Sequence, residues 1–269
     1  MTEESSVIQL FESAGILGAI RWAYESAASR VADTYSFADG HTPTWVGVSR
    51  YTYFVDRLDR VFGTGRFAPP AGSEEPVGRD VLHAELTQQD IDSMPDLEVG
   101  LVRRSDVNGS AGWVHEGWRW LLVSARPGKI DAIMWGQKSE TKKRVARQRD
   151  TMPDQPSLFD ELVEDEYELV QEQIAAAEKL DLETLIVAHA QDVDRDRREL
   201  VIGRARLNEG GGAAWTWRRS LRLEAPPEDK MTGTVPMGPQ APITPVVPDA
   251  DVRLRPRFDD RRDAAGSGS

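Results

Sequence analysis

The apolar residues near the start of the chain recur every three to five positions, which is the spacing of one face of an α-helix. We expect a helix over residues 6–36 and a second over residues 49–62, after the break at Asp39-Gly40-His41-Thr42-Pro43. In the second segment an apolar face is expected to be buried. The charged positions are expected to face outward; they are Arg50, Asp56, Arg57, Asp59 and Arg60. The pattern over residues 1–67 therefore predicts a pair of helices.

Residues 80–224 change to a pattern that favours strands. Thr87 is expected to cap a short helix, and two β-rich runs follow, Glu98–Arg104 and Trp113–Ser124, with turn-forming residues between them. Three later runs separated by polar turns predict an antiparallel meander. They are Thr184–Ala190, Glu199–Leu207 and Ala214–Leu223.

Helical patterns return between these strands. They cover residues 127–149 and residues 158–180, where Ser157 can act as the N-cap and carboxylates are crowded. From residue 225 Pro and Gly recur, which predicts a disordered tail over 225–269. The elements segregate along the chain, so we predict an α+β fold. Its parts are an N-terminal helical pair, a Trp-rich β-hairpin, a long acidic helix and a three-stranded antiparallel meander. Residues 80–224 can share one domain with residues 1–67.

The composition of the chain excludes several classes of protein function. The chain has 269 residues and a net charge of −12, which argues against a generalised phosphate-binding surface. Cysteine is absent, which excludes a disulfide framework and thiolate chemistry. The first residues are acidic and no apolar run reaches about 18 residues, so we expect no membrane contact and a cytoplasmic location.

One short segment departs from this acidic background. Between residues 138 and 149 the basic side chains are opposed only by Glu140. They are Lys138, Lys142, Lys143, Arg144, Arg147 and Arg149. Such a run predicts either a solvated helix face or a weak, local contact with DNA.

Residues with catalytic or metal-binding chemistry are scattered along the sequence. The closest two histidines, His83 and His115, stand 32 positions apart, so no zinc-type spacing is present. His115 and His189 could still meet in space. Asp192-Val193-Asp194 resembles the start of an EF-hand loop, but the required glycine is absent. We predict no metal and no cofactor, and the catalytic residues, if any, stay unknown.

A restriction-type nuclease core uses carboxylates to hold Mg²⁺ and a lysine to steady the attacking water. The residue types of this core are present as Pro95-Asp96 and Glu140-Thr141-Lys142, although Glu140 lies in a helical and basic segment.

Two pairs of tryptophans stand at strand spacing. Trp118 and Trp120, and likewise Trp215 and Trp217, are two positions apart, which predicts that both rings of each pair share one face of a strand. Each pair predicts either packed core or an aromatic platform for single-stranded nucleic acid or another ligand.

The segment Gln155-Pro156-Ser157-Leu158-Phe159 is the most specific motif. It resembles the Gln-x-x-Leu-Phe peptide by which bacterial polymerases, repair factors and some phage-related proteins dock on the replication sliding clamp. The resemblance implies that Gln155 hydrogen-bonds at the rim of the clamp pocket, and that Leu158 and Phe159 fill it. The motif departs from the preferred pattern at Pro156. Phe159 also falls in phase with the apolar stripe of the acidic helix, so burial is the alternative.

These features favour a non-enzymatic binding or adaptor protein of bacterial DNA metabolism. It would be an accessory factor in replication, repair or phage defence that docks on the sliding clamp. Two alternatives stay open. One is a metal-dependent nuclease or another enzyme with a dispersed site, and the other is a regulator that binds a protein partner through the acidic helix.

Overall fold

The computed structural model of the chain describes residues 2–70, 77–148, 182–209 and 211–222. All of these residues belong to one compact unit, Met1–Glu224. The predicted acidic helix over 158–180 and the predicted tail over 225–269 lie outside the described residues. Within the described part, no helix has the length and apolar composition that crossing a membrane requires.

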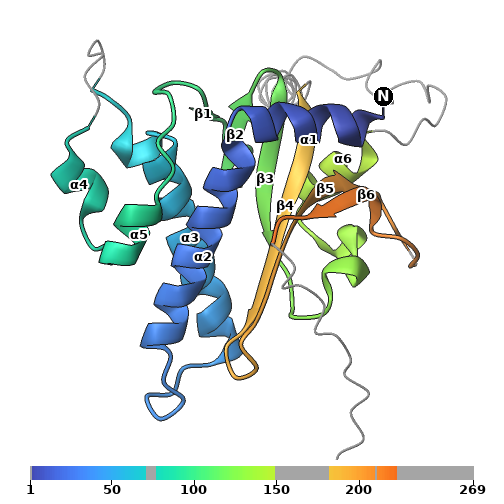
Figure 1. Ribbon diagram of the computed structural model, residues 1–269. Coiled ribbons are helices and arrows are strands. Elements are labelled where there is room, and N and C mark those ends of the chain that lie inside the picture. The colour runs from blue at the N-terminus through green and yellow to red at the C-terminus, as the bar shows by residue number, and fades with distance from the viewer. Residues whose placement is uncertain (1, 71–76, 149–181, 210, 223–269) are drawn as a thin grey trace, which may run out of the picture. The chain divides into compact units, whose positions relative to one another are not determined.

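A six-stranded mixed sheet runs through this unit (Figure 1). The strands are neighbours in sequence order, and every pair is antiparallel except β3 and β4, which run parallel. They are β1 (Arg103–Arg104), β2 (Gly112–His115), β3 (Trp118–Ser124), β4 (Glu183–Asp192), β5 (Arg197–Ala205) and β6 (Trp215–Ser220). The fold thus combines helices with a mixed sheet. The three strands predicted near the end extend this sheet, instead of forming one of their own.

Helices cover one face of the sheet. They are α1 (Glu3–Ser13), α2 (Ile16–Thr34) and α3 (Pro43–Val61). Phe11, Ile20 and Phe54 of these helices share a hydrophobic core with Trp120 and Val187 of the sheet. The helical pair is therefore not a separate body, because its apolar faces are buried against the strands.

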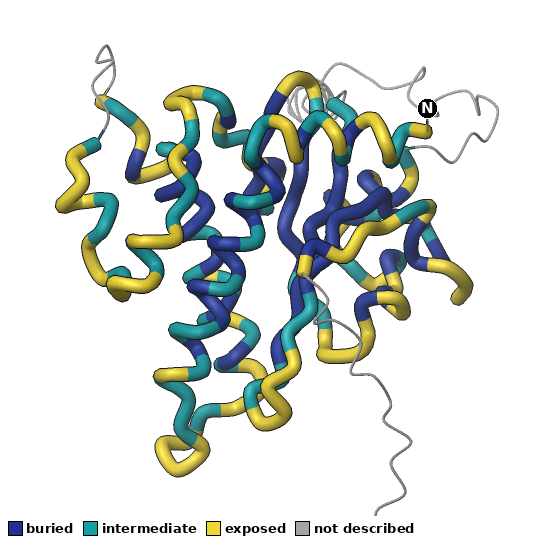
Figure 2. The backbone as a smooth tube through the Cα atoms, in the orientation of Figure 1, coloured by how far each residue is buried: buried dark blue, intermediate teal, exposed yellow. Residues whose placement is uncertain are grey.

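The opposite face of the sheet is covered by the connection between β3 and β4. This connection contains η2 (Ile130–Ala132), η3 (Trp135–Gln137) and α6 (Glu140–Arg147), so only part of the predicted helix over 127–149 is α-helical. Leu121 and Ile186, which alternate with the residues of the first core, pack here with Trp135. Figure 2 shows the consequence: the central strands are buried along most of their length.

Gly15 divides the first predicted helix into two. Its φ of 73° lies in the left-handed region that favours glycine, and an added Cβ would come within 2.8 Å of the Leu97 side chain. The second predicted helix begins six residues earlier than expected, at Pro43. Thr42 caps it by accepting a hydrogen bond from the Trp45 amide, and proline is favoured at a first helical position.

The remaining helices are short and lie between α3 and the sheet in sequence. They are η1 (Gly65–Phe67), α4 (Arg79–His83) and α5 (Gln88–Ser93). Thr87 caps α5 in a reciprocal capping box with Asp90, and the backbone carbonyl of Asp90 accepts a hydrogen bond from the indole of Trp22 on α2 at 2.9 Å. The run Trp113–Ser124 contains two strands, because Glu116 and Gly117 adopt positive φ values and form a tight hairpin turn.

A β-bulge places Trp215 and Trp217 on opposite faces of the sheet, contrary to the expectation from their spacing. Ala205 faces Trp215 but Arg204 faces Trp217, so one extra residue is inserted in β6. Trp215 packs edge-on against Trp135 on one face, with ring centroids 5.4 Å apart. On the other face, Trp217 donates a hydrogen bond to Glu3 of α1 at 3.1 Å. These rings act in packing.

Gly203 provides a test of the close packing between β5 and β6. An added Cβ would collide with the Trp217 carbonyl oxygen and the Arg218 backbone, whereas at Gly18 of α2 it would meet nothing within 4 Å. We expect Gly203→Ala to lower the free energy of unfolding by about 1–3 kcal/mol, because the added methyl group would push β5 away from the backbone of β6. The matched control, Gly18→Ala, should raise it by up to about 1 kcal/mol, because alanine favours helix. Urea unfolding of both variants measures this, and equal effects would contradict it.

Candidate functional site

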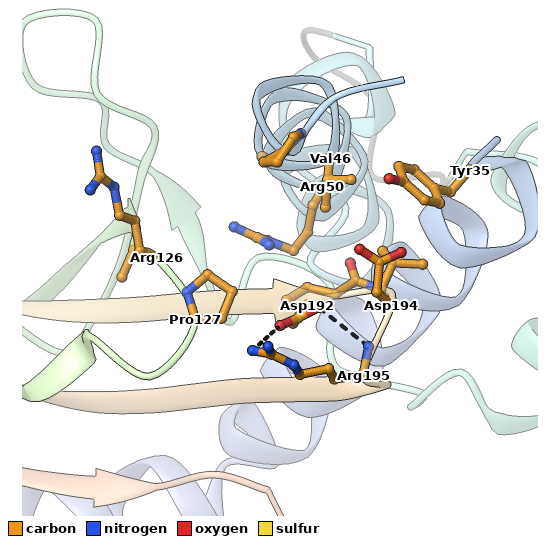
Figure 3. A pocket seen from close by; sticks show the side chains of 13 residues that line it. Tyr35, Val46, Arg50, Arg126, Pro127, Asp192, Asp194 and Arg195 are labelled. Atoms are coloured by element: carbon orange, nitrogen blue, oxygen red, sulfur yellow. Dashed lines mark hydrogen bonds and ion pairs between the residues drawn. The ribbon is translucent and has the colours of Figure 1, made fainter. Parts of the chain in front are cut away.

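The parallel strands open a cleft at their carboxyl ends (Figure 3). β3 leads there into Ala125, Arg126 and Pro127, while β4 leads into the hairpin turn after Asp192. Chains that leave neighbouring parallel strands in different directions leave a crevice, where α/β proteins commonly bind ligands. A cavity of about 460 Å³ lies at this place, within the usual range for small-molecule sites. Its other wall comes from Tyr35 and the first turns of α3.

Arg50 is the central charged group of the cleft. The residue is only 2% exposed, and its Nε donates a hydrogen bond to Nδ1 of His189 at 2.8 Å. No described carboxylate forms an ion pair with Arg50, and Figure 3 shows its guanidinium reaching toward the space beside Pro127. Burial lowers the pKa of Arg50, but a guanidinium stays protonated in proteins. The cleft therefore holds a buried cation whose charge no described side chain balances, which is costly without an anion.

His189 fixes the orientation of Arg50. The imidazole is fully buried and packs edge-on against Phe54 at 5.1 Å and against Tyr24 at 6.1 Å. Burial, and then the charge of Arg50, hold the pKa of His189 well below its usual value. Because Nδ1 accepts from Arg50, the ring proton is on Nε2, which lies 3.4 Å from the hydroxyl of Ser124.

This tautomer excludes Ser124 and His189 as a nucleophile and its general base, and neither residue lines the cavity. A general base for Ser124 would need an unprotonated Nε2, with a carboxylate accepting from Nδ1–H. Here Nδ1 faces a cation instead. The role that remains for His189 is to position Arg50.

Further charged groups stand at the mouth of the cleft. Arg126 is exposed, and no described residue forms an ion pair with it. Arg195 forms an ion pair with Asp192 at 3.5 Å and also hydrogen-bonds that carboxylate through its backbone amide. Asp194 is exposed beside them (Figure 3). Three arginines and two aspartates therefore border one cavity, with an excess of one positive charge.

The cleft also holds an amide group with an unused acceptor. Gln191 is 5% exposed, and its Nε2 donates to the carbonyl oxygen of Ala28 at 2.8 Å. The Oε1 atom of Gln191 is buried and has no hydrogen-bond partner. Such an atom is costly to bury without a hydrogen-bond donor.

The predicted basic segment does not form one exposed row. Lys142 is 8% exposed because it lies one turn before Ala146 on the face of α6 that packs against the sheet. Lys143 pairs with Glu140 at 2.6 Å. Arg147 pairs with Glu209 at 3.0 Å, Lys138 is half-buried, and Arg144 is exposed. Arg149 lies outside the described residues.

The histidines that could have formed an enzyme site do not meet. His115 faces Trp118 at the start of β3, whereas His189 faces Ser124 at its end, which separates them by about 20 Å along the strands. Lys142, the lysine of the nuclease-like segment Glu140-Thr141-Lys142, is buried in a helix. A restriction-type nuclease core requires this lysine on a strand. Among the described residues, no group of three or more His, Asp or Glu side chains could hold a metal ion.

Gln155, Leu158 and Phe159 lie outside the described residues, so the likeness to clamp-binding peptides stays a prediction. The chain matches no protein-family model, and comparisons with curated proteins and with solved structures find no match either.

Sequence reasoning missed Arg50, which it placed on the outer face of α3. Arg57 and Arg60, also expected outside, are 4% and 5% exposed. A signal for Arg50 was present, because it precedes Phe54 and Leu58 by four and eight positions and so shares their buried face.

The burial of Lys142 should make the free energy of unfolding depend on pH. Burial, and then the nearby charge of Lys138, lower the pKa of Lys142 from 10.5 to about 8. Between these values the unfolded chain binds more protons than the folded protein, so stability rises with pH. The shift corresponds to a rise of about 3 kcal/mol between pH 8 and 10.5. Lys142→Met should be more stable than the unmodified protein at pH 7, and this advantage should shrink over that range.

Urea unfolding at pH 7, 8, 9 and 10 measures this difference. The comparison of the two proteins removes the contributions of the titrating groups that do not interact with Lys142. A difference that does not change with pH would show that Lys142 titrates normally.

Proposed function

We propose that the protein is a non-enzymatic binding protein whose cleft holds the anionic group of a ligand. The observation that carries this proposal is Arg50, a buried guanidinium that His189 orients and that no described carboxylate neutralises. Its terminal nitrogens can donate two parallel hydrogen bonds to a phosphate or carboxylate. An anion would restore the charge balance of the cleft.

Several features support binding rather than catalysis. Proton transfer needs a group that titrates near neutral pH and reaches the reacting atom. His189 is held neutral, its Nδ1 is occupied and it does not line the cavity, whose polar side chains are arginines, aspartates, Tyr35 and Gln191. This set recognises charge and shape without offering an acid–base pair.

We further propose that the protein acts as an adaptor in bacterial DNA metabolism, in replication, repair or phage defence. The motif Gln155-Pro156-Ser157-Leu158-Phe159 supports docking on the sliding clamp as its partner. The exposed Arg144 and the half-exposed lysines around it support at most a weak, local DNA contact.

The anion proposal predicts that inorganic phosphate stabilises the protein through Arg50. At tenfold excess over its dissociation constant, phosphate should raise the free energy of unfolding by about 1.4 kcal/mol. Arg50→Met should abolish this gain. Its own effect on stability combines two opposed changes, because the unbalanced buried charge is removed while Nδ1 of His189 loses its donor. Arg219→Met, which removes only an exposed pair with Glu4 at 3.0 Å, is the control and should respond to phosphate normally.

Thermal and urea unfolding with and without phosphate measure these effects. Equilibrium dialysis of the unmodified protein against phosphate needs no variant, so it decides the question even where Arg50→Met does not fold. Absence of saturable binding there, or an undiminished response of Arg50→Met, would contradict the proposal.

The docking proposal predicts that replacing both Leu158 and Phe159 with Ala removes binding to a purified bacterial sliding clamp. Exposed anchors should leave the free energy of unfolding within about 0.5 kcal/mol. If Phe159 is instead packed in a core, Phe159→Ala alone should cost roughly 3–5 kcal/mol. Surface plasmon resonance against the clamp, combined with thermal unfolding, separates the two results. If the unmodified protein does not bind the clamp and Phe159→Ala is destabilised, the docking proposal is wrong.

A further inference from the structure

We propose that the anion in the cleft is the phosphate of a 5′-nucleotide, with its base packed against Tyr35. This inference rests on the proposed anion-binding function and adds the class of ligand. The ligand chemistry is a nucleoside monophosphate, either free or at the end of a nucleic-acid strand.

The volume of the cleft calls for more than an inorganic ion. Its 460 Å³ reaches from Arg50 of α3 to Tyr35 and to the turn after β4. Val46 and Pro43 on one side, with Pro127 on the other, give this space apolar walls. A pocket of this kind fits a ligand that has both an apolar body and a polar end.

An aromatic group forms one end of the cavity. Tyr35 is half-buried and lines the cavity, and Figure 3 shows its ring turned toward Val46 and Arg50. Close to Tyr35, His41 and Trp45 stack with centroids 3.9 Å apart and an interplanar angle of 4°. The Tyr35 centroid lies 6.2 Å from that of His41 and 6.4 Å from that of Trp45, so its position is supported by both rings.

Such a wall favours a flat ligand group. Stacking of a base on an aromatic side chain contributes about 1–3 kcal/mol. His41 is held in turn because its Nδ1 accepts a hydrogen bond from the Ser36 amide at 3.0 Å. The wall is therefore arranged before any ligand arrives.

The charges of the cleft limit the ligand to a single phosphate group. Arg50, Arg126 and Arg195 provide three positive charges, and Asp192 and Asp194 provide two negative ones. A phosphomonoester carries about −1.5 to −2 at neutral pH. One such group is attracted to Arg50, whereas a longer polyphosphate would also meet the two carboxylates.

An acceptor for the hydroxyl groups of a ribose is present at the mouth of the cavity, where the carboxylate of Asp194 is exposed. It cannot bind a phosphate favourably, because it offers only lone pairs and a negative charge. A sugar placed between the phosphate and the base would supply the donors that it needs. The unpartnered Oε1 of Gln191 is too deeply buried for a ligand to reach it without a movement of the side chain.

The test compares dissociation constants by isothermal titration calorimetry. The probes are the four common nucleoside 5′-monophosphates, ribose 5-phosphate and inorganic phosphate. At least one nucleotide should bind the unmodified protein tenfold or more tightly than ribose 5-phosphate. Tyr35→Leu should reduce that preference to about threefold or less and leave ribose 5-phosphate binding unchanged. Phe37→Leu is the matched control, because Phe37 is 83% exposed and does not line the cavity.

The outcomes separate this inference from the function beneath it. If all four nucleotides bind only as well as ribose 5-phosphate, and binding still needs Arg50, the nucleotide assignment is wrong and the anion site stands. If no phosphate compound binds, both are wrong. The preference of the unmodified protein decides the matter even where Tyr35→Leu does not fold.

A second arm identifies the source of the nucleotide. It compares the best monophosphate with a 5′-phosphorylated single strand that begins with the same nucleotide. Tighter binding of the strand supports a nucleic-acid end as the ligand, and tighter binding of the mononucleotide supports a free metabolite.

Discussion

The parallel pairing of β3 with β4 is the constraint on which the other features of the fold depend. A tight turn can join antiparallel strands but not parallel ones. The chain must therefore cross over the sheet between Ser124 and Glu183. The crossover covers one face with η2, η3 and α6, while α1, α2 and α3 cover the other. Both strands are then buried on both faces, and their carboxyl ends diverge into the cleft that contains Arg50.

The individual elements were predictable where the pattern is local. Apolar spacing located the last three strands to within a few residues, and Thr87 correctly marked the start of α5. The same spacing joined α1 and α2 into one helix and began α3 six residues too late. The parallel pair was not predicted, because β3 and β4 are separated by 58 residues whose local pattern carries no information about pairing. The continuous apolar runs at Leu121–Val123 and Leu185–Ala188 were a usable signal, since they indicate burial on both faces.

The candidate site was harder to predict than the fold, because it depends on side chains that break the binary pattern. Arg50 and Lys142 are charged residues at buried helix positions, and the sequence pattern placed both on exposed helix faces. The bulge that separates Trp215 from Trp217 has the same character, since one inserted residue reverses the face of every later side chain. Such exceptions to local rules are expected where a structure is specialised. Arg50 is the exception that also lines a cavity and has no described counter-ion.

The site and the whole molecule differ in the sign of their charge, and this difference restricts how a ligand can bind. The chain carries a net −12, so it repels a long polyanion at a distance, although physiological salt screens that field beyond about 8 Å. Extended nucleic-acid binding draws its affinity from counterion release along many phosphates. The cleft offers one buried guanidinium and two others at its mouth. Its affinity must therefore come from desolvated contacts with a single group, which favours a compact anion over the body of a nucleic-acid strand.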